Sequence, residues 1–193
     1  MNACQPSVTL DGEQITLRPT GPGDEQPMTR YFEELSPESR RLRFHQPVPI
    51  VKPWLIRPLV DVDHTVHVAW TAWSGARIVG EARYVRLRSD PTSAEIAFSV
   101  ADTHRRRGIG TLMVESLGEL ARADGVEAFT SMVGHDNRAS SAFLTGLGTR
   151  FSFADGALEG RAPVPAWSRS SELAACLVRC HRAIAPQLME VAA

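Results

Sequence analysis

The stretch from residue 94 to residue 121 most constrains what this chain can fold into, because three kinds of segment follow one another in it. An apolar run with β-branched and aromatic residues, Ala94–Val100, predicts a buried strand. Beyond a basic loop, apolar residues recur at helical spacing from Ile109 onward, at Leu112, Met113, Leu117, Leu120 and Ala121. This spacing predicts an amphipathic helix, so the stretch is interpreted as strand, loop and helix.

Three arginines and two glycines occupy the loop, namely Arg105, Arg106, Arg107, Gly108 and Gly110. The first turn of a helix leaves backbone N–H groups without partners, and the helix dipole makes that end partly positive. Glycines let a bulky anion approach these groups, and arginines add charge-assisted hydrogen bonds. The loop is therefore expected to hold a pyrophosphate.

The loop sequence Arg105-Arg106-Arg107-Gly108-Ile109-Gly110 resembles the pantetheine-cofactor loop of the GNAT (GCN5-related N-acetyltransferase) superfamily. Two further matches support the resemblance: Glu95-Ile-Ala-Phe on the preceding strand, and Asn137-Arg138-Ala139, which leads to Gly148 at the family's usual spacing. The resemblance covers roughly residues 14 to 167. It implies an α/β (α+β) GNAT fold, with a mixed, mostly antiparallel twisted sheet flanked by helices. It also implies a gap between the Glu95 strand and the next strand, where the pantetheine arm lies.

The resemblance assigns roles to individual residues. It implies Glu95 as the general base and the backbone N–H of Val100 as the donor to the thioester carbonyl. The residues expected to hold acetyl-CoA (coenzyme A), the acyl-donor cosubstrate, are Phe98, Val100, Arg105, Arg106, Arg107, Gly108, Ile109, Gly110, Thr111 and Asn137. Asn137 has a second expected role as the cap of the following helix. No metal is expected in the site.

The sequence around Glu95 gives an independent reason to consider it as the base. Transfer of an acyl group to an amine requires that the amine lose a proton. Ala94 and Ile96 on either side are apolar, so desolvation is expected to raise the pKa of Glu95 toward a value useful for a base. The alternative interpretation is a strand glutamate that pairs with a nearby arginine, such as Arg83 or Arg86.

An acid for the departing thiolate is harder to find. Many relatives place a tyrosine seven residues after the asparagine of the helix that follows, and here that position is Leu144. Tyr84, Tyr31 or water could replace it, or the thiolate could leave without an acid. For Tyr84 the preferred interpretation is packing on a strand with a solvated hydroxyl.

The composition offers no general argument for a nucleic-acid or membrane partner. The 193 residues carry a formal net charge of -1, and 43% of them are hydrophobic. No apolar run is long enough to span a bilayer, and the N-terminus lacks the basic start and apolar core of a secretory signal. The expectation is a cytoplasmic protein that binds neither nucleic acid nor a membrane.

We expect one domain over residues 14–167, a loose lead-in over 1–13 and a C-terminal helical extension over 168–193. Expected strands lie at 15–19, 66–73, 77–87, 94–100 and 126–133, with a final hairpin around 151–158, and expected helices lie at 24–35, 36–44, 54–60, 109–123, 138–147 and 171–190. The last helix either lies on the domain or forms a homodimer contact. In it, Cys176, Cys180 and His181 suggest a metal or redox site, but the preferred interpretation is two small apolar residues on the inner helix face.

The resulting hypothesis is an acetyl-CoA-dependent N-acetyltransferase that transfers the acetyl group directly from the thioester to a primary amine. Residues 35–44 are similar to the corresponding stretch of bacterial protein lysine acetyltransferases, which suggests a protein lysine as the acceptor. Small amines such as aminoglycosides or polyamines are the alternative acceptors. Two other functions stay open: a non-catalytic acyl-CoA-binding sensor, which the missing tyrosine favours, and a partner-binding protein that uses the C-terminal helix.

Overall fold

The computed structural model describes residues 5–154 and 156–189. Its strands are β1 (Ser7–Leu10), β2 (Glu13–Pro19), β3 (His67–Ser74), β4 (Arg77–Arg86), β5 (Ser93–Val100), β6 (Ala128–Gly134), β7 (Arg150–Ala154) and β8 (Ala157–Pro163). Its helices are α1 (Glu25–Glu34), α2 (Pro37–Phe44), α3 (Pro53–Val60), α4 (Ile109–Ala123), α5 (Arg138–Gly146) and α6 (Ser171–Met189). Short 3-10 helices lie at Pro22–Asp24 and Asp102–His104.

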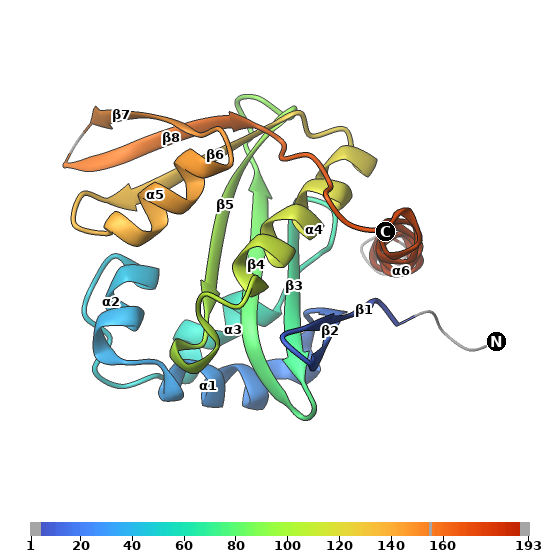
Figure 1. Cartoon of the computed structure of the whole chain (residues 1–193), viewed down its shortest axis with the longest axis horizontal. Coiled ribbons are helices and arrows are strands. Elements are labelled where there is room, and N and C mark those ends of the chain that lie inside the picture. Colours follow the sequence, from blue (N-terminus) through green and yellow to red (C-terminus); the bar gives the residue numbers. More distant parts are fainter. Residues whose placement is uncertain (1–4, 155, 190–193) are drawn as a thin grey trace.

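The described strands form one eight-stranded sheet in the order β1-β2-β3-β4-β5-β6-β8-β7 (Figure 1). Neighbouring strands are antiparallel except for β5 and β6, which are parallel. The prediction of a mixed, mostly antiparallel sheet flanked by helices is therefore confirmed.

One strand was not expected from the sequence. Residues 7–10, which we expected to be part of a loose lead-in, form β1 and pair with β2. A tight turn joins the two strands, because Asp11 and Gly12 both have positive φ, 48° and 78°. Residues 1–4 of the expected lead-in lie outside the described residues.

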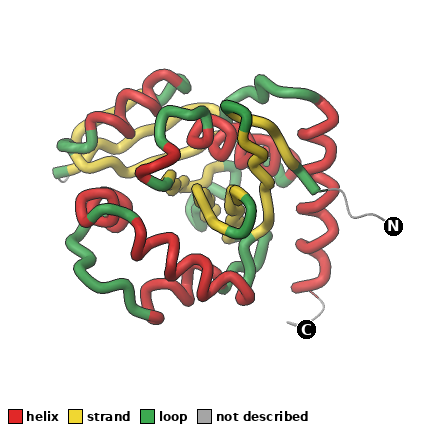
Figure 2. Tube along the Cα trace, turned by 60° about the horizontal axis from the view of Figure 1, so that its bottom comes forward, coloured by secondary structure: helices red, strands yellow, loops and turns green. Residues whose placement is uncertain are grey.

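Helices cover both faces of the central strands (Figures 1 and 2). On the face covered by α4 and α5, the core includes Trp70, Tyr84 and Leu112, each at most 1% exposed. The opposite face is covered by α1, α2 and α3, where a second core includes Phe32 and Ile56. Since successive side chains of a strand point to opposite faces, β4 is buried along almost its whole length.

Local sequence signals explain where two of the helices begin. At α2, the Ser36 side chain accepts a hydrogen bond of 3.2 Å from the backbone N–H of Ser39, and Pro37 occupies the first helical position. At α4, the cap position is Gly108, whose φ of 80° is a backbone conformation that favours glycine.

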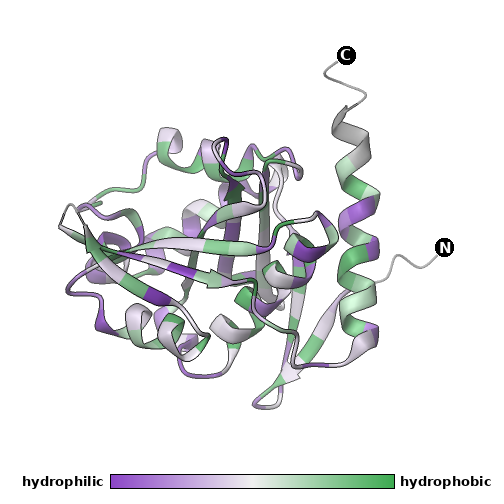
Figure 3. Ribbon diagram, turned by 90° about the horizontal axis from the view of Figure 1, so that it is seen from above, coloured by the Kyte–Doolittle hydropathy of each residue, from purple (hydrophilic) through white to green (hydrophobic). Residues whose placement is uncertain are grey.

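The C-terminal helix α6 packs against α4 on one side of the molecule (Figure 3). Leu177 and His181 are fully buried there, and Nε2 of His181 lies 2.8 Å from Oδ2 of Asp124. Cys176 is buried and Cys180 packs against the same core. Within residues 5–154 and 156–189 no cluster of three or more His, Cys, Asp or Glu side chains could hold a metal ion. No described helix is long and apolar enough to cross a membrane.

The two parallel strands separate soon after they meet. Register pairs join β5 and β6 only up to Glu95, which is aligned with Thr130. Beyond that pair β5 continues to Val100, about 17 Å further along at about 3.3 Å per residue. Figure 1 shows the two strands diverging, with β5 running downward and β6 toward the left. The predicted gap next to the Glu95 strand is therefore present.

Candidate active site

Glu95 lies at the apex of the gap between β5 and β6, and its side chain is exposed. The expectation that apolar neighbours would desolvate it is wrong. Ala94 and Ile96 are buried on the opposite face of the sheet, because side chains alternate along a strand. The alternative of an ion pair is not realised either, since Glu95 forms none with any residue that the structure describes. Arg83 binds Glu81 instead.

The backbone N–H groups of Phe98 and Val100 point toward this gap. In an antiparallel pair of strands, directly opposed residues alternate between two kinds. In one kind the two residues bond to each other through their N–H and C=O groups, and in the other kind these groups point away from the partner strand. On β5 the odd-numbered positions bond to β4, as shown by the bond of 2.9 Å from the N–H of Ala101 to the carbonyl of Val79. The even-numbered positions therefore direct their N–H groups to the other side, where β6 has already diverged.

A pocket runs through the gap from α2 to α5. Its lining comes from four elements: Leu42, Arg43 and His45 at the end of α2; Glu95, Ile96, Ala97 and Phe98 on β5; Ser131, Met132 and Val133 on β6; and Asn137, Ser140 and Leu144 at α5. The Phe98 ring, which lines the pocket, packs against Phe143 of α5, with ring centroids 5.3 Å apart. Glu95 and Phe98 are thus brought together with Asn137, as the sequence interpretation required.

The basic loop places the start of α4 at the open end of the gap. Gly108 precedes the helix, and Ile109, Gly110 and Thr111 form its first turn. The N–H groups of such a turn have no partner one turn earlier, so they are available to an anion. A Cβ on Gly110 would meet Val100 at 3.8 Å, an ordinary contact, so packing alone does not require glycine at this position.

Two of the three loop arginines already have carboxylate partners. Arg105 lies 2.9 Å from Asp102, and Arg107 lies 2.7 Å from Glu13 on β2. Arg106 is exposed, has a φ of 59°, and forms no ion pair among the described residues. All three arginines were expected to hold the cofactor, whereas in the structure carboxylates hold Arg105 and Arg107, and Arg106 has no ion pair among the described residues.

The helix that follows β6 begins as expected. Asn137 caps α5, because its side-chain oxygen accepts a hydrogen bond of 3.1 Å from the N–H of Ser140. Leu144, at the position where many relatives have a tyrosine, is 2% exposed and lines the pocket. Two hydroxyl groups, those of Ser131 and Ser140, belong to pocket-lining residues.

Neither tyrosine belongs to this pocket. The hydroxyl of Tyr84 donates to Oδ2 of Asp124 at 2.5 Å, and the side chain is fully buried, so the expected solvated hydroxyl is wrong. The hydroxyl of Tyr31 lies 2.9 Å from Oγ of Ser99. Burial raises the pKa of both tyrosines, which makes them poor proton donors.

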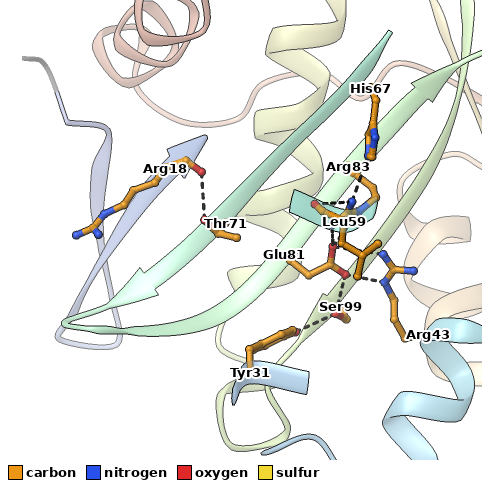
Figure 4. Close-up of polar contacts among 9 residues, drawn as sticks. All are labelled: Arg18, Tyr31, Arg43, Leu59, His67, Thr71, Glu81, Arg83 and Ser99. Carbon is orange, nitrogen blue, oxygen red and sulfur yellow. Dashed lines mark hydrogen bonds and ion pairs between the residues drawn. The ribbon is translucent and has the colours of Figure 1, made fainter. Parts of the chain in front are cut away.

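A buried charge network next to the pocket was missed in the sequence (Figure 4). Glu81 on β4 is completely buried, with Nε of Arg43 at 2.6 Å and Nη2 of Arg83 at 3.1 Å. Oγ of Ser99 donates to it at 2.8 Å and also contacts Tyr31. Burial alone would raise the pKa of Glu81, but the two arginines outweigh it and lower that pKa to about 2. Glu81 and Arg83, two residues apart and so on one face of a central strand, were the available signal, since buried charges need partners.

Comparison with known proteins identifies the family. The model of the Acetyltransferase (GNAT) family matches residues 28–148, more than half of the chain. The chain belongs to the GNAT acetyltransferase family. It is 35% identical over 147 residues to acetyltransferase Pat of Mycolicibacterium smegmatis, an alignment that covers 74% of this chain and 43% of that protein. It is 27% identical over 142 residues to acetyltransferase PA5475 of Pseudomonas aeruginosa, covering 72% of this chain and 76% of the other.

Solved structures show the same likeness. The GNAT domain of S. lividans PAT superposes with a TM-score of 0.78 at 25% identity and covers 84% of this chain and 98% of that domain. A cAMP-binding acyltransferase from Mycobacterium smegmatis superposes with a TM-score of 0.70 at 27% identity and covers 95% of this chain but 55% of that protein. The chain thus spans about half the length of its mycobacterial relatives.

GNAT acetyltransferases use acetyl-CoA, and the residues of this chain fit such a molecule. The unpartnered first turn of α4 and the exposed Arg106 suit a pyrophosphate. The gap between β5 and β6 leads from there to Glu95, with the N–H groups of Phe98 and Val100 along one side.

Proposed function

We propose that this protein transfers an acetyl group from acetyl-CoA directly to a primary amine. One observation carries the proposal. Glu95 lies at the apex of the β5–β6 gap without an ion pair among the described residues, while the start of α4, whose first N–H groups suit an anion, lies at the open end of the same gap. A ligand with an anionic end and a reactive end fits between them.

In this proposal Glu95 accepts the proton of the attacking amine. The nitrogen then forms a bond to the acetyl carbon while the carbon–sulfur bond breaks, and CoA leaves as the thiolate. Bound acetyl-CoA supplies the activated thioester. The N–H of Val100 donates to the carbonyl oxygen as negative charge develops on it, and the N–H of Phe98 borders the same gap.

The departing thiolate takes its proton from water in this proposal. Leu144 provides no proton, and both tyrosine hydroxyl groups lie outside the pocket. A thiolate is a good leaving group, so an enzymatic acid is not required for turnover. Asn137 caps α5 and at the same time lines the pocket, so it is suited to contact the pantetheine arm.

We propose a protein lysine as the acceptor. The similarity of residues 35–44 to bacterial protein lysine acetyltransferases supports this choice, and the chain is similar to two acetyltransferases that carry the name Pat. In this proposal residues 14–167 form the catalytic domain, and residues 168–193 form a C-terminal extension. The reaction takes place in the cytoplasm.

The test combines binding and turnover. Acetyl-CoA at a hundred times its dissociation constant should add about 2.7 kcal/mol to the free energy of unfolding. Gly108→Val should lose this gain, because a β-branched side chain is strained at the positive φ of that position. Thiol release with lysine peptides then measures turnover. Stabilisation by acetyl-CoA without turnover of any amine would indicate the sensor instead, and no stabilisation at all would refute the cofactor site.

A further inference from the structure

A row of side chains crosses the sheet on the face that carries Glu95. The strand registers align Glu95 with Thr130, Thr130 with Arg161, and Arg161 with Arg150. In the other direction Glu95 is aligned with Val85. Register partners point to the same face of a sheet, so these five residues form one row, here called the Glu95 row.

The Glu95 row is open to solvent. Val85 is 40% exposed, Thr130 is half-buried, and the other three side chains are exposed. Neighbouring positions on the same face of β6 and β8 are open too, since Met132 is 51% exposed and Glu159 is exposed. The row therefore forms an accessible surface that includes the proposed base, Glu95.

Two arginines face each other at one end of this row. Arg150 and Arg161 are directly opposite on β7 and β8, an arrangement in which like charges destabilise a sheet. Their compensation is small. Arg161 lies 3.5 Å from Asp90, with both side chains well exposed, and Arg150 forms no ion pair within the described residues. Glu159, in the next row, pairs with neither. An anionic partner would relieve the repulsion.

The spacing of the row fits an extended peptide. Neighbouring strands lie about 4.8 Å apart, which puts Arg161 about 10 Å and Arg150 about 14 Å from Glu95. An extended chain advances about 3.3 Å per residue. A peptide whose lysine reaches Glu95 would therefore bring its third or fourth neighbour on one side to the arginine pair. On the other side it would meet the exposed apolar side chain of Val85.

We propose that the Glu95 row is the docking surface for the polypeptide segment around the acceptor lysine. Arg150 and Arg161 recognise an acidic side chain three or four residues from that lysine. The inference rests on the proposed function and deepens it, because it defines the acceptor as a peptide with an acidic residue on one side only.

The experiment measures kcat/KM for acetylation of a set of peptides with one central lysine. Four peptides carry Asp at the third or fourth position before or after the lysine, and matched peptides carry Asn there. The Asp peptides of one side should be about 1.5-fold to fivefold better than their Asn partners, the range expected for exposed ion pairs. This preference should weaken as salt is raised, because exposed charges are screened.

Two variants test the assignment. Arg150→Gln with Arg161→Gln should reduce the Asp/Asn ratio to about one. Arg150→Glu combined with Arg161→Glu should reverse it and favour a matched peptide with Lys in place of Asp. Arg182→Gln, at an exposed position of α6, is the control and should keep the wild-type ratio.

The outcomes separate this inference from the proposed function. If no peptide and no small amine is acetylated, the proposed function itself fails. If the peptides are acetylated but the Asp/Asn ratio is one in the wild type, or is unchanged in the double variant, the docking assignment is refuted. An equal gain from Asp on both sides of the lysine would indicate diffuse attraction and would refute it as well.

Discussion

The part of the sheet around Glu81 is covered on both faces, whereas the part beyond Glu95 is covered on one face only. The two glutamates lie on the same face of neighbouring strands. Helices α1 to α3 enclose Glu81, and arginines from α2 and β4 keep it ionised. Glu95 is exposed to solvent and has no ion pair among the described residues. Because Glu81 is buried and paired, it is a structural charge. Because Glu95 is neither, it is able to accept a proton.

The largest effect is expected from Glu81→Gln. This change leaves Arg83, which is 5% exposed, without its buried counter-charge, and breaking a buried pair costs about 3 kcal/mol of unfolding free energy or more. Chemical denaturation measures the loss. Glu95→Gln is the matched control, and its unfolding free energy should change by less than about 0.5 kcal/mol. Equal losses in the two variants would contradict the contrast between the regions.

Glu95→Gln should instead reduce turnover. Removal of a general base lowers kcat by about a hundredfold or more. The stabilisation by acetyl-CoA should stay close to that of the wild type, because Glu95 lies far along β5 from the start of α4. Steady-state kinetics and thermal unfolding with acetyl-CoA measure the two effects. Full turnover in this variant would require another base.

Stability at acid pH gives a third comparison. The folded-state pKa of Glu81, about 2, is below the ordinary value of 4.5, so folding favours the ionised form. Its contribution to stability is present above pH 4.5 and is lost as the pH falls toward 2. The unfolding free energy of the wild type should decline over this range more steeply than that of Glu81→Gln. Parallel curves would mean that Glu81 is not the group responsible.

The smallest effect is expected at the end of the Glu95 row. Arg150→Thr removes one of two opposed like charges and places a strand-favouring residue on β7, so unfolding free energy should rise by about 0.3 kcal/mol. Arg150→Lys keeps the charge and should give no such gain. If Arg150→Thr and Arg150→Lys have the same unfolding free energy in chemical denaturation, the two arginines do not repel each other measurably.

Much of the fold followed from local patterns. The apolar run before Val100, the helical spacing after Ile109 and the capping residues Ser36 and Asn137 act over a few residues, so their consequences were visible in the sequence. β1 escaped prediction because its four residues gain their order from pairing with β2.

The residues of the site were predictable from the sequence, but their burial and ion pairing were not. The sequence by itself determined that an acidic residue precedes a basic glycine loop and a helix, and that Leu144 replaces a tyrosine. Only the tertiary structure decided that Glu95 is exposed and that Glu81 is the buried acid. It also decided that Arg107 is held by a carboxylate of β2. Burial and ion pairing depend on residues far apart in the chain, and only folding brings these together.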